Sequence, residues 1–406
     1  MSLNSEVGVI SQTISCSSQP SLPSLEHSCN SSSSSCHYQC IATLRGNSSY
    51  VSGLAVDGDS LYVASSDGHI RLWPLDAAMA MRQTSQSEVS SSTVAVTDSS
   101  VKCHVATGDG LVSSHQDGTI RVWRHAGGGR NGSRRLALRA VLPTTADCLR
   151  MFLLPGSYVE VRRHKKRTWV HHVDAVTALA LSPDGARMYS VSWDRSLKAW
   201  RLPSLRCAES VAAAHDDAIN AVVAAPDGHV YTASADRTVK AWRRHPGQKK
   251  LSLVSVMERH SAAVNALALG GVGGRVLYSG ACDRSVVVWE ASGGGADGRM
   301  VATVTLRGHA KAVLCLAAAG DVVCSGSADR TVRVWRRGAE GYSCLAVLDG
   351  HGRAVKSLAL VRGRAGCDRC CACDVEESSS CGCAALVCSG SLDCDVKLWR
   401  VTVSSL

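Results

Sequence analysis

The chain has 406 residues, of which 45% are hydrophobic and 19% are charged, so it can bury a substantial core. No apolar run approaches the ~18 residues of a transmembrane helix, and the first basic residue is Arg45, so we expect neither a membrane span nor a secretory signal. The net charge of +10 favours acidic partners, and we expect the 19 cysteines to be reduced thiols in the cytoplasm and nucleus.

The N-terminal 36 residues differ in composition from the rest of the chain. They are dominated by serine, including the run "SSSSS" at 31–35, and contain no aromatic side chain. Such a segment cannot bury enough apolar surface to offset the entropy lost on ordering, so we predict a disordered tail over 1–36. The next stretch, "YQCIATLRG" at 38–46, has the character of a β-strand.

From residue 37 to the end, one short stretch returns seven times, each time with an Asp six residues before a Trp. The seven copies are "SSDGHIRLW", "HQDGTIRVW", "SWDRSLKAW", "SADRTVKAW", "ACDRSVVVW", "SADRTVRVW" and "SLDCDVKLW". The intervals between successive Asp residues are 50, 77, 42, 47, 46 and 64, and the short ones match the ~40 to 45 residues of a four-stranded propeller blade. The long intervals predict insertions at about 125–168 and 361–384.

Each copy alternates in the manner of a strand with something to bury on both faces: Val332 and Val334 point one way, and Trp335 points the other. Sheets that are apolar on both faces are covered when they stack radially in a ring. We therefore predict an all-β, seven-bladed β-propeller over 37–406. The chain stops seven residues after Trp399, too early for a last strand, so the strand at 38–46 is expected to complete the seventh blade.

A second mark precedes most of the Asp residues: a His followed four residues later by an apolar residue, and preceded by Gly in Gly308-His309 and Gly350-His351. These features resemble the WD-repeat β-propeller family, although no closing Trp is followed by the Asp of that family's name. The stretches "CIATLRGNSSYVSGLAVDGDSLYVASSDGHIRLW", "YVEVRRHKK" and "SGSLDCDVKLW" are similar to plant WD-repeat proteins of the JINGUBANG type. That resemblance implies regulatory propellers of the cytoplasm and nucleus, associated with pollen germination and transcription regulators.

Ser, His and Asp recur together, which raises the possibility of a hydrolase triad. A catalyst needs one exposed nucleophile, whereas a set repeated around a ring fits a buried network in which Trp donates to Ser, Ser to His and His to Asp. The WD-repeat resemblance implies the same network. The predicted sets are His172, Ser192, Asp194, Trp200; His215, Ser234, Asp236, Trp242; His309, Ser327, Asp329, Trp335; and His351, Ser391, Asp393, Trp399. Unit five has Ala281 and unit two His115 at the Ser position, so these networks are expected to be incomplete or to use water.

The residue after the Asp is Arg in units three to six: Arg195, Arg237, Arg284 and Arg330. By resemblance this turn lies on the top face of the propeller, where partners dock. Arg forks suit carboxylates and phosphates, so the four could bind an acidic or phosphorylated segment of another protein. The alternative is a solvated turn whose arginines pair with Asp residues of neighbouring blades.

Two segments of the insertions carry other candidate sites. The basic run Arg162, Arg163, Lys165, Lys166 and Arg167 is read as a nuclear import signal, a nucleic-acid or lipid patch, or a plain solvated loop. The cysteine-rich segment 366–383 offers Cys367, Cys370, Cys381 and Cys383 as zinc ligands, but the second pair is spaced too closely for a usual structural site. We expect no metal there.

These patterns favour a non-catalytic, monomeric protein-interaction scaffold without a cofactor. One alternative is a substrate receptor of a cullin-type ubiquitin ligase, for which Arg244 and Arg337 fit the receptor motif while Arg243 and Arg336 contradict it. Another is a propeller that binds phosphate or nucleic acid, although we do not expect nucleic acid because Trp169 is the only Trp near the basic run. No nucleotide-binding or metalloprotease motif supports an enzyme.

Overall fold

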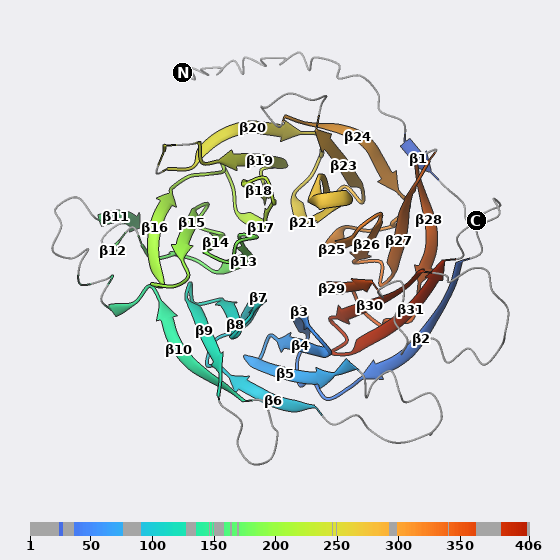
Figure 1. Ribbon diagram of the computed structural model, residues 1–406, viewed down its shortest axis with the longest axis horizontal. Helices are drawn as coiled ribbons and strands as arrows, with labels where there is room; N and C mark the ends of the chain where they lie inside the picture. Colours follow the sequence, from blue (N-terminus) through green and yellow to red (C-terminus); the bar gives the residue numbers. More distant parts are fainter. Residues whose placement is uncertain are drawn as a thin grey trace, which may run out of the picture.

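The computed structural model describes residues 24–26, 36–75, 91–126, 135–145, 147, 149, 158–162, 165–168, 170–245, 247–248, 250–291, 299–339, 341–362 and 383–403. These residues form seven antiparallel sheets, arranged as the four-stranded blades of a ring, and one of them gains a fifth strand from the N-terminal segment (Figure 1). The predicted seven-bladed β-propeller is therefore confirmed. No helix among the described ranges has the length and apolar character needed to cross a bilayer.

The strands follow one another from the centre of each blade outwards. Blade one has β3 (Val51–Asp57), β4 (Ser60–Ser65), β5 (His69–Pro74) and β6 (Ser92–Val96), and blade two has β7 (Val101–Thr107), β8 (Gly110–His115), β9 (Ile120–His125) and β10 (Leu136–Leu142). Blade three has β13 (Val176–Leu181), β14 (Arg187–Ser192), β15 (Leu197–Arg201) and β16 (Arg206–Val211). Blade four has β17 (Ile219–Ala224), β18 (His229–Ser234), β19 (Thr238–Arg243) and β20 (Ser252–Glu258).

The remaining blades follow the same plan. Blade five has β21 (Val264–Gly270), β22 (Val276–Ala281), β23 (Val286–Ala291) and β24 (Met300–Arg307), with a short 3-10 turn η1 (Val272–Gly274) after its first strand. Blade six has β25 (Val313–Ala319), β26 (Val322–Ser327), β27 (Val332–Gly338) and β28 (Gly341–Leu348). Blade seven has β29 (Val355–Arg362), β30 (Cys383–Ser391), β31 (Val396–Val403) and, as its outermost strand, β2 (Cys36–Leu44).

The ring is closed by its N-terminal strand, as predicted. β2 pairs antiparallel with β31, with Cys40 opposite Trp399 and Leu44 opposite Val396. Figure 1 shows this earliest long strand lying outside the latest one. The pairing covers the edge that β31 would otherwise offer to another chain.

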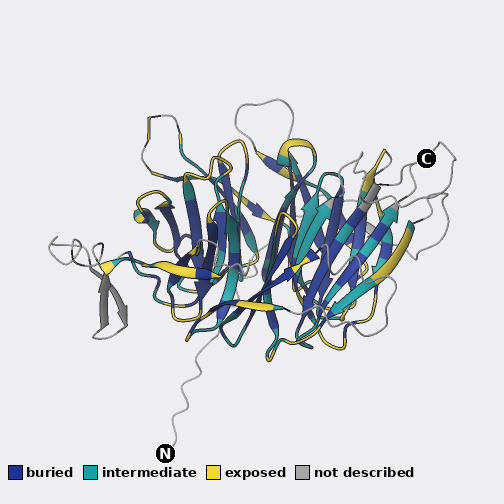
Figure 2. Cartoon of the chain, turned by 60° about the horizontal axis from the view of Figure 1, so that its bottom comes forward, coloured by how far each residue is buried: buried dark blue, intermediate teal, exposed yellow. Residues whose placement is uncertain are grey.

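The core lies between the blades rather than inside them. Seven clusters of buried apolar side chains each combine residues from two neighbouring blades. Between blades five and six, for example, Tyr278 and Val286 pack with Val313 and Trp335. Figure 2 shows buried residues along the strands of the blades and exposed residues mainly in the turns. Both faces of each blade are therefore covered by its neighbours, which is the physical reason for the closed ring.

The tail and the insertions differ from the sequence-based expectations in three places. Within the expected tail, β1 (Ser24–Glu26) pairs in parallel with β24, and Figure 1 shows it beside the end of that strand. Within the insertion expected at 125–168, β10 is the outer strand of blade two, so only the part beyond it is inserted. That part contains a separate hairpin of β11 (Tyr158–Arg162) and β12 (Lys165–Thr168).

The innermost strand of every blade carries a β-bulge at the same place, one residue after the first buried apolar residue. A bulge re-aims the side chain of its extra residue. The bulged residues, here called the inner rim, are Ser52, Lys102, Thr177, Asn220, Asn265, Leu314 and Lys356. They recur on seven adjoining inner strands and so form one level around the centre.

Candidate functional site

A buried polar network links two loops at one end of a blade, and blade six shows it fully. The Trp335 indole N–H donates to Ser325 Oγ over 2.9 Å, and the Ser325 hydroxyl donates to His309 Nε2 over 2.8 Å. The His309 Nδ1–H then donates to Asp329 Oδ2 over 2.8 Å. His309 precedes β25 and Asp329 lies in the turn between β26 and β27. The network therefore fixes the turn against the loop that enters the blade.

The predicted serine of this network was wrong by two residues. Ser327 instead donates to the Lys311 carbonyl and accepts the Asp329 N–H, within the turn. Ser325 lies opposite Arg333, which is two residues from Trp335 on the same face of the sheet, so Ser325 is diagonal to the tryptophan. Ser327 lies two residues further along the strand, away from Trp335. The network residues are Ser190, Thr232, Ser325 and Ser389, where Ser192, Ser234, Ser327 and Ser391 were expected.

The same shift changes the interpretation of blade five. Trp289 donates to Ser279 Oγ, Ser279 to His260, and His260 to Asp283, with distances of 2.8, 2.8 and 2.9 Å. The network of blade five is complete, so the expectation of an incomplete one was wrong. Ala281 occupies the turn position, which does not contribute to the network.

Blades one and two depart from this pattern. In blade two, Trp123 donates to Ser113, and Ser113 to His115 of its own strand, while Asp117 pairs with Arg121 rather than with a histidine. In blade one the equivalent residue is Val63, and no described acceptor lies near the Trp73 indole N–H. The blades without a histidine in the entering loop therefore also lack the full network.

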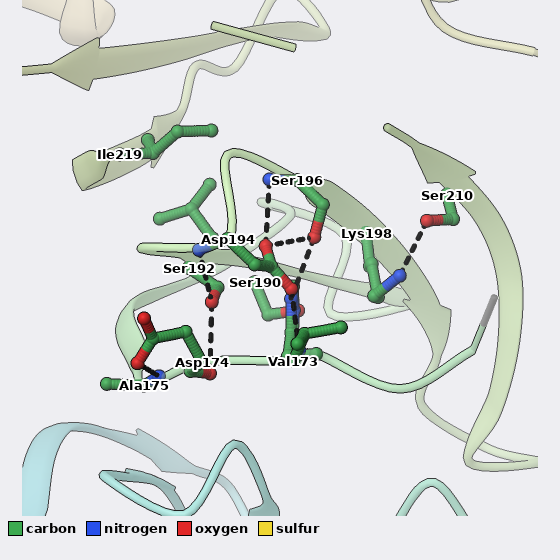
Figure 3. Close-up of polar contacts among 12 residues, drawn as sticks. Val173, Asp174, Ala175, Ser190, Ser192, Asp194, Ser196, Lys198, Ser210 and Ile219 are labelled. Atoms are coloured by element: carbon green, nitrogen blue, oxygen red, sulfur yellow. Dashed lines mark hydrogen bonds and ion pairs between the residues drawn. The ribbon is translucent and has the colours of Figure 1, made fainter. Parts of the chain in front are cut away.

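The carboxylates of the network are ionised and firmly held. Figure 3 shows Asp194 receiving hydrogen bonds from Ser196 and the Val173 backbone. Burial alone would raise the pKa of Asp194, but the hydrogen bonds from His172, Ser196 and Val173 outweigh it and hold that pKa well below its ordinary value. Burial lowers the pKa of His172, so the imidazole stays neutral. The network serines are fully buried, which denies them the access that a hydrolytic nucleophile needs.

The turn held by each Asp places its next residue in a strained and exposed position. Arg195, Arg237, Arg284 and Arg330 have φ values of 66°, 73°, 70° and 76°, where Gly68 and Gly118 stand in blades one and two. Each arginine N–H closes its turn by donating to the carbonyl three residues earlier, over 3.1–3.2 Å. All four side chains are exposed, and within the described parts of the chain none makes an ion pair or a side-chain hydrogen bond.

These turns and the loops that enter the blades form one face, here called the arginine face. Its charge is uneven. Beside blades three and four the entering loops carry the exposed acids Asp174, Asp216 and Asp217, which offset Arg195 and Arg237. The loop that enters blade six carries the exposed Lys311, and the loop that enters blade seven carries both Arg353 and Asp349, which offset each other. The positive charge of this face is therefore concentrated on the side of blades five and six.

The other predicted residues lie elsewhere or outside the described residues. Of the basic run, Arg162 lies at the end of β11 and 165–167 lie in β12. Arg163, the side chains of the run and those of all four candidate zinc ligands lie outside the described residues. Arg244 pairs with Glu209 over 2.9 Å and Arg337 with Glu290 over 3.1 Å. The two arginines proposed for ubiquitin-ligase recognition are thus engaged within the propeller.

Comparison with known proteins agrees with this architecture. The model of the WD domain, G-beta repeat, matches residues 38–74, 163–201, 208–243, 251–290 and 300–336. Striatin-4 from Homo sapiens is 43% identical over 60 residues, which are 14% of this chain and 8% of striatin-4. Telomerase protein component 1 from Mus musculus is 27% identical over 204 residues, 44% of this chain and 7% of that protein. The chain thus spans less than a tenth of either relative. The five matched repeats, set in a seven-bladed ring, support a WD-repeat family for this chain.

Proposed function

We propose that this chain is a non-catalytic scaffold that binds other proteins through its arginine face. The observation that carries the proposal is the set of four exposed turn arginines, each held in a left-handed conformation by an ionised Asp and each free of ion pairs within the described residues. Propellers of the WD-repeat type typically bind other proteins. Because Arg forks suit carboxylate and phosphate groups, the partner segment is acidic or phosphorylated.

The test is partner capture with a charge-reversed arginine face. The tagged protein is purified from its native tissue, and its bound proteins are identified by mass spectrometry for wild type and for the variant with Glu at Arg195, Arg237, Arg284 and Arg330. We expect the variant to lose the acidic partners while its melting temperature stays close to that of wild type, since the four side chains make no ion pair or side-chain hydrogen bond with the described residues.

A matched control keeps the change of charge but moves it to another surface. Arg135, Arg139, Arg201 and Arg206 are also exposed, and they lie on the outer strands and strand ends of blades two and three. Glu at these four positions should leave the partner set intact. Equal loss in both variants would indicate a general charge effect, and no loss in either would refute a role for the arginine face.

The finer role that we propose rests on the resemblance to JINGUBANG-type proteins. We propose a monomeric regulatory protein of the plant cytoplasm and nucleus that acts in growth or pollen germination and binds transcription regulators. Ala at the five basic residues of the run 162–167 should exclude a fluorescent fusion from the nucleus. An unchanged nuclear signal would remove that run as the import signal.

A further inference from the structure

The inner rim joins neighbouring blades in part of the ring. In blades three, four and five its side chains donate to a carbonyl of the next inner strand: Thr177 to Ile219 O over 2.6 Å, Asn220 to Val264 O over 2.9 Å, and Asn265 to Val313 O over 2.8 Å. These three residues are neutral and have their hydrogen bonds satisfied within the ring. At these blades the rim has a structural role.

Blades seven and two differ, because each has a lysine at the rim. Lys356 and Lys102 stand on either side of Ser52 of blade one, and neither lysine has an ion-pair partner within the described ranges. Burial lowers the pKa of Lys102, and the positive charge of Lys356 lowers it further. The positive charge of Lys356 therefore acts at Lys102 across blade one, and neither lysine forms an ion pair with a carboxylate of the described residues. In blades three to five the rim residue joins two blades, whereas in blades two and seven it is a lysine without an ion-pair partner among the described residues.

An exposed aromatic side chain adjoins these lysines. Trp193, in the turn of blade three, is 41% exposed, whereas the seven tryptophans that close the repeats are buried. The Lys102 Nζ lies 5.4 Å from the centre of the Trp193 ring. This contact orients the lysine and presents a large apolar face beside a cationic group. A ligand that has both a negative charge and an adjoining apolar part would use both features.

We propose that Lys102, Lys356 and Trp193 form a binding site for the phosphoryl group of a phosphorylated protein segment. The inference rests on the proposed function: the phosphorylated residue of the partner segment binds at this site, and the acidic residues beside it bind on the arginine face. A phosphoryl group carries about −1.5 to −2 charges at neutral pH and can offset both ammonium groups, whereas a side-chain carboxylate offsets only one. Trp193 then covers the apolar part of a neighbouring residue.

Continuity of charge gives the bound segment a direction. From Lys356, the exposed basic residues Arg353, Lys311 and Arg330 lie over blades seven and six, whereas Asp174, Asp216 and Asp217 lie over blades three and four. Blade seven also carries the exposed Asp349, so the acidic flank of the segment runs towards blade six, and its apolar flank lies towards Trp193.

The test measures binding of a capped peptide with one phosphoserine flanked by neutral and apolar residues, with its unphosphorylated form as control, by titration calorimetry. Wild type should bind the phosphopeptide at least about tenfold more tightly than the control peptide. The double variant Lys102→Gln and Lys356→Gln should lose this preference, and Trp193→Ala should weaken it. Lys250→Gln, at an exposed lysine between β19 and β20, should retain it.

Three outcomes would overturn the proposal. Equal affinity for the two peptides would exclude a phosphoryl site, and an unchanged preference in the double lysine variant would place the site elsewhere. Binding of inositol hexakisphosphate that needs both lysines, without phosphopeptide binding, would assign the site to a soluble polyphosphate. The variant with Glu at the four turn arginines separates the two proposals: retention of short-peptide binding alongside loss of captured partners would show that each surface acts independently.

Discussion

His104 gives the sharpest test of the electrostatics of this ring. It lies on β7 with 4% of its surface exposed, and its Nε2–H donates to the Tyr62 carbonyl over 3.2 Å. Its Nδ1 faces Gly53, and no hydrogen-bond partner for that atom exists among the described residues. Burial lowers the pKa of His104 to about 4, and the hydrogen bond to Tyr62 only partly opposes this shift. A proton on Nδ1 would therefore place a charge in the core without an acceptor.

The consequence is a loss of stability in mild acid. An unfolded histidine titrates near pH 6.5, so between pH 6.5 and 4 the unfolded chain binds a proton that the folded chain does not. The stability that the neutral His104 provides is fully present above pH 6.5 and is lost as the pH falls towards 4. At pH 5.0 the free energy of unfolding is therefore about 2 kcal/mol lower than at pH 7.5.

The assay compares wild type with His104→Gln, which keeps a donor for Tyr62 but cannot be charged. Urea unfolding followed by tryptophan fluorescence gives the free energy of unfolding at both pH values. The drop between pH 7.5 and 5.0 should be smaller in the variant by about 2 kcal/mol, while His37→Gln, at an exposed histidine, should behave as wild type. The same drop in wild type and His104→Gln would refute the reasoning, because the other histidines are common to both.

Three further predictions concern the stability of the ring. Ser279→Ala should lower the free energy of unfolding by about 1–3 kcal/mol because it leaves the Trp289 and His260 nitrogens unpaired, whereas the exposed Ser261→Ala should change it little; equal urea midpoints for the two variants would contradict this. Deletion of 36–44 should expose the β31 edge and produce aggregates in light scattering, and a monomer with the wild-type melting temperature would show that β2 does not close the ring in solution. At Arg237, with φ of 73°, Asn should preserve the melting temperature while Val should lower the free energy of unfolding by about 1–3 kcal/mol; equal melting of both variants would indicate a relaxed turn.

The fold could be predicted because its determinants repeat. The Asp six residues before each Trp marks a turn and the strand that follows it. Because the pattern occurs seven times and each sheet is apolar on both faces, a closed ring of seven sheets is the arrangement that covers every face. The network serine could not be chosen on the same ground: Ser325 and Ser327 share one face of a strand, and only the register with β27 shows which of them reaches Trp335. Lys102 and Lys356 were missed for a related reason, because the alternation of a strand does not reveal a bulge.

The pairing of β2 with β31 also constrains how the molecule is made. Thr43 and Lys397, whose side chains meet in blade seven, are 354 residues apart in the chain. During synthesis the N-terminal strand leaves the ribosome long before its partner exists, so blades one to six can assemble while their two ends are still open. A chaperone that binds residues 36–44 until β31 has been synthesised would protect this unpaired strand. Release of the strand would then allow it to pair with β31 and complete the ring.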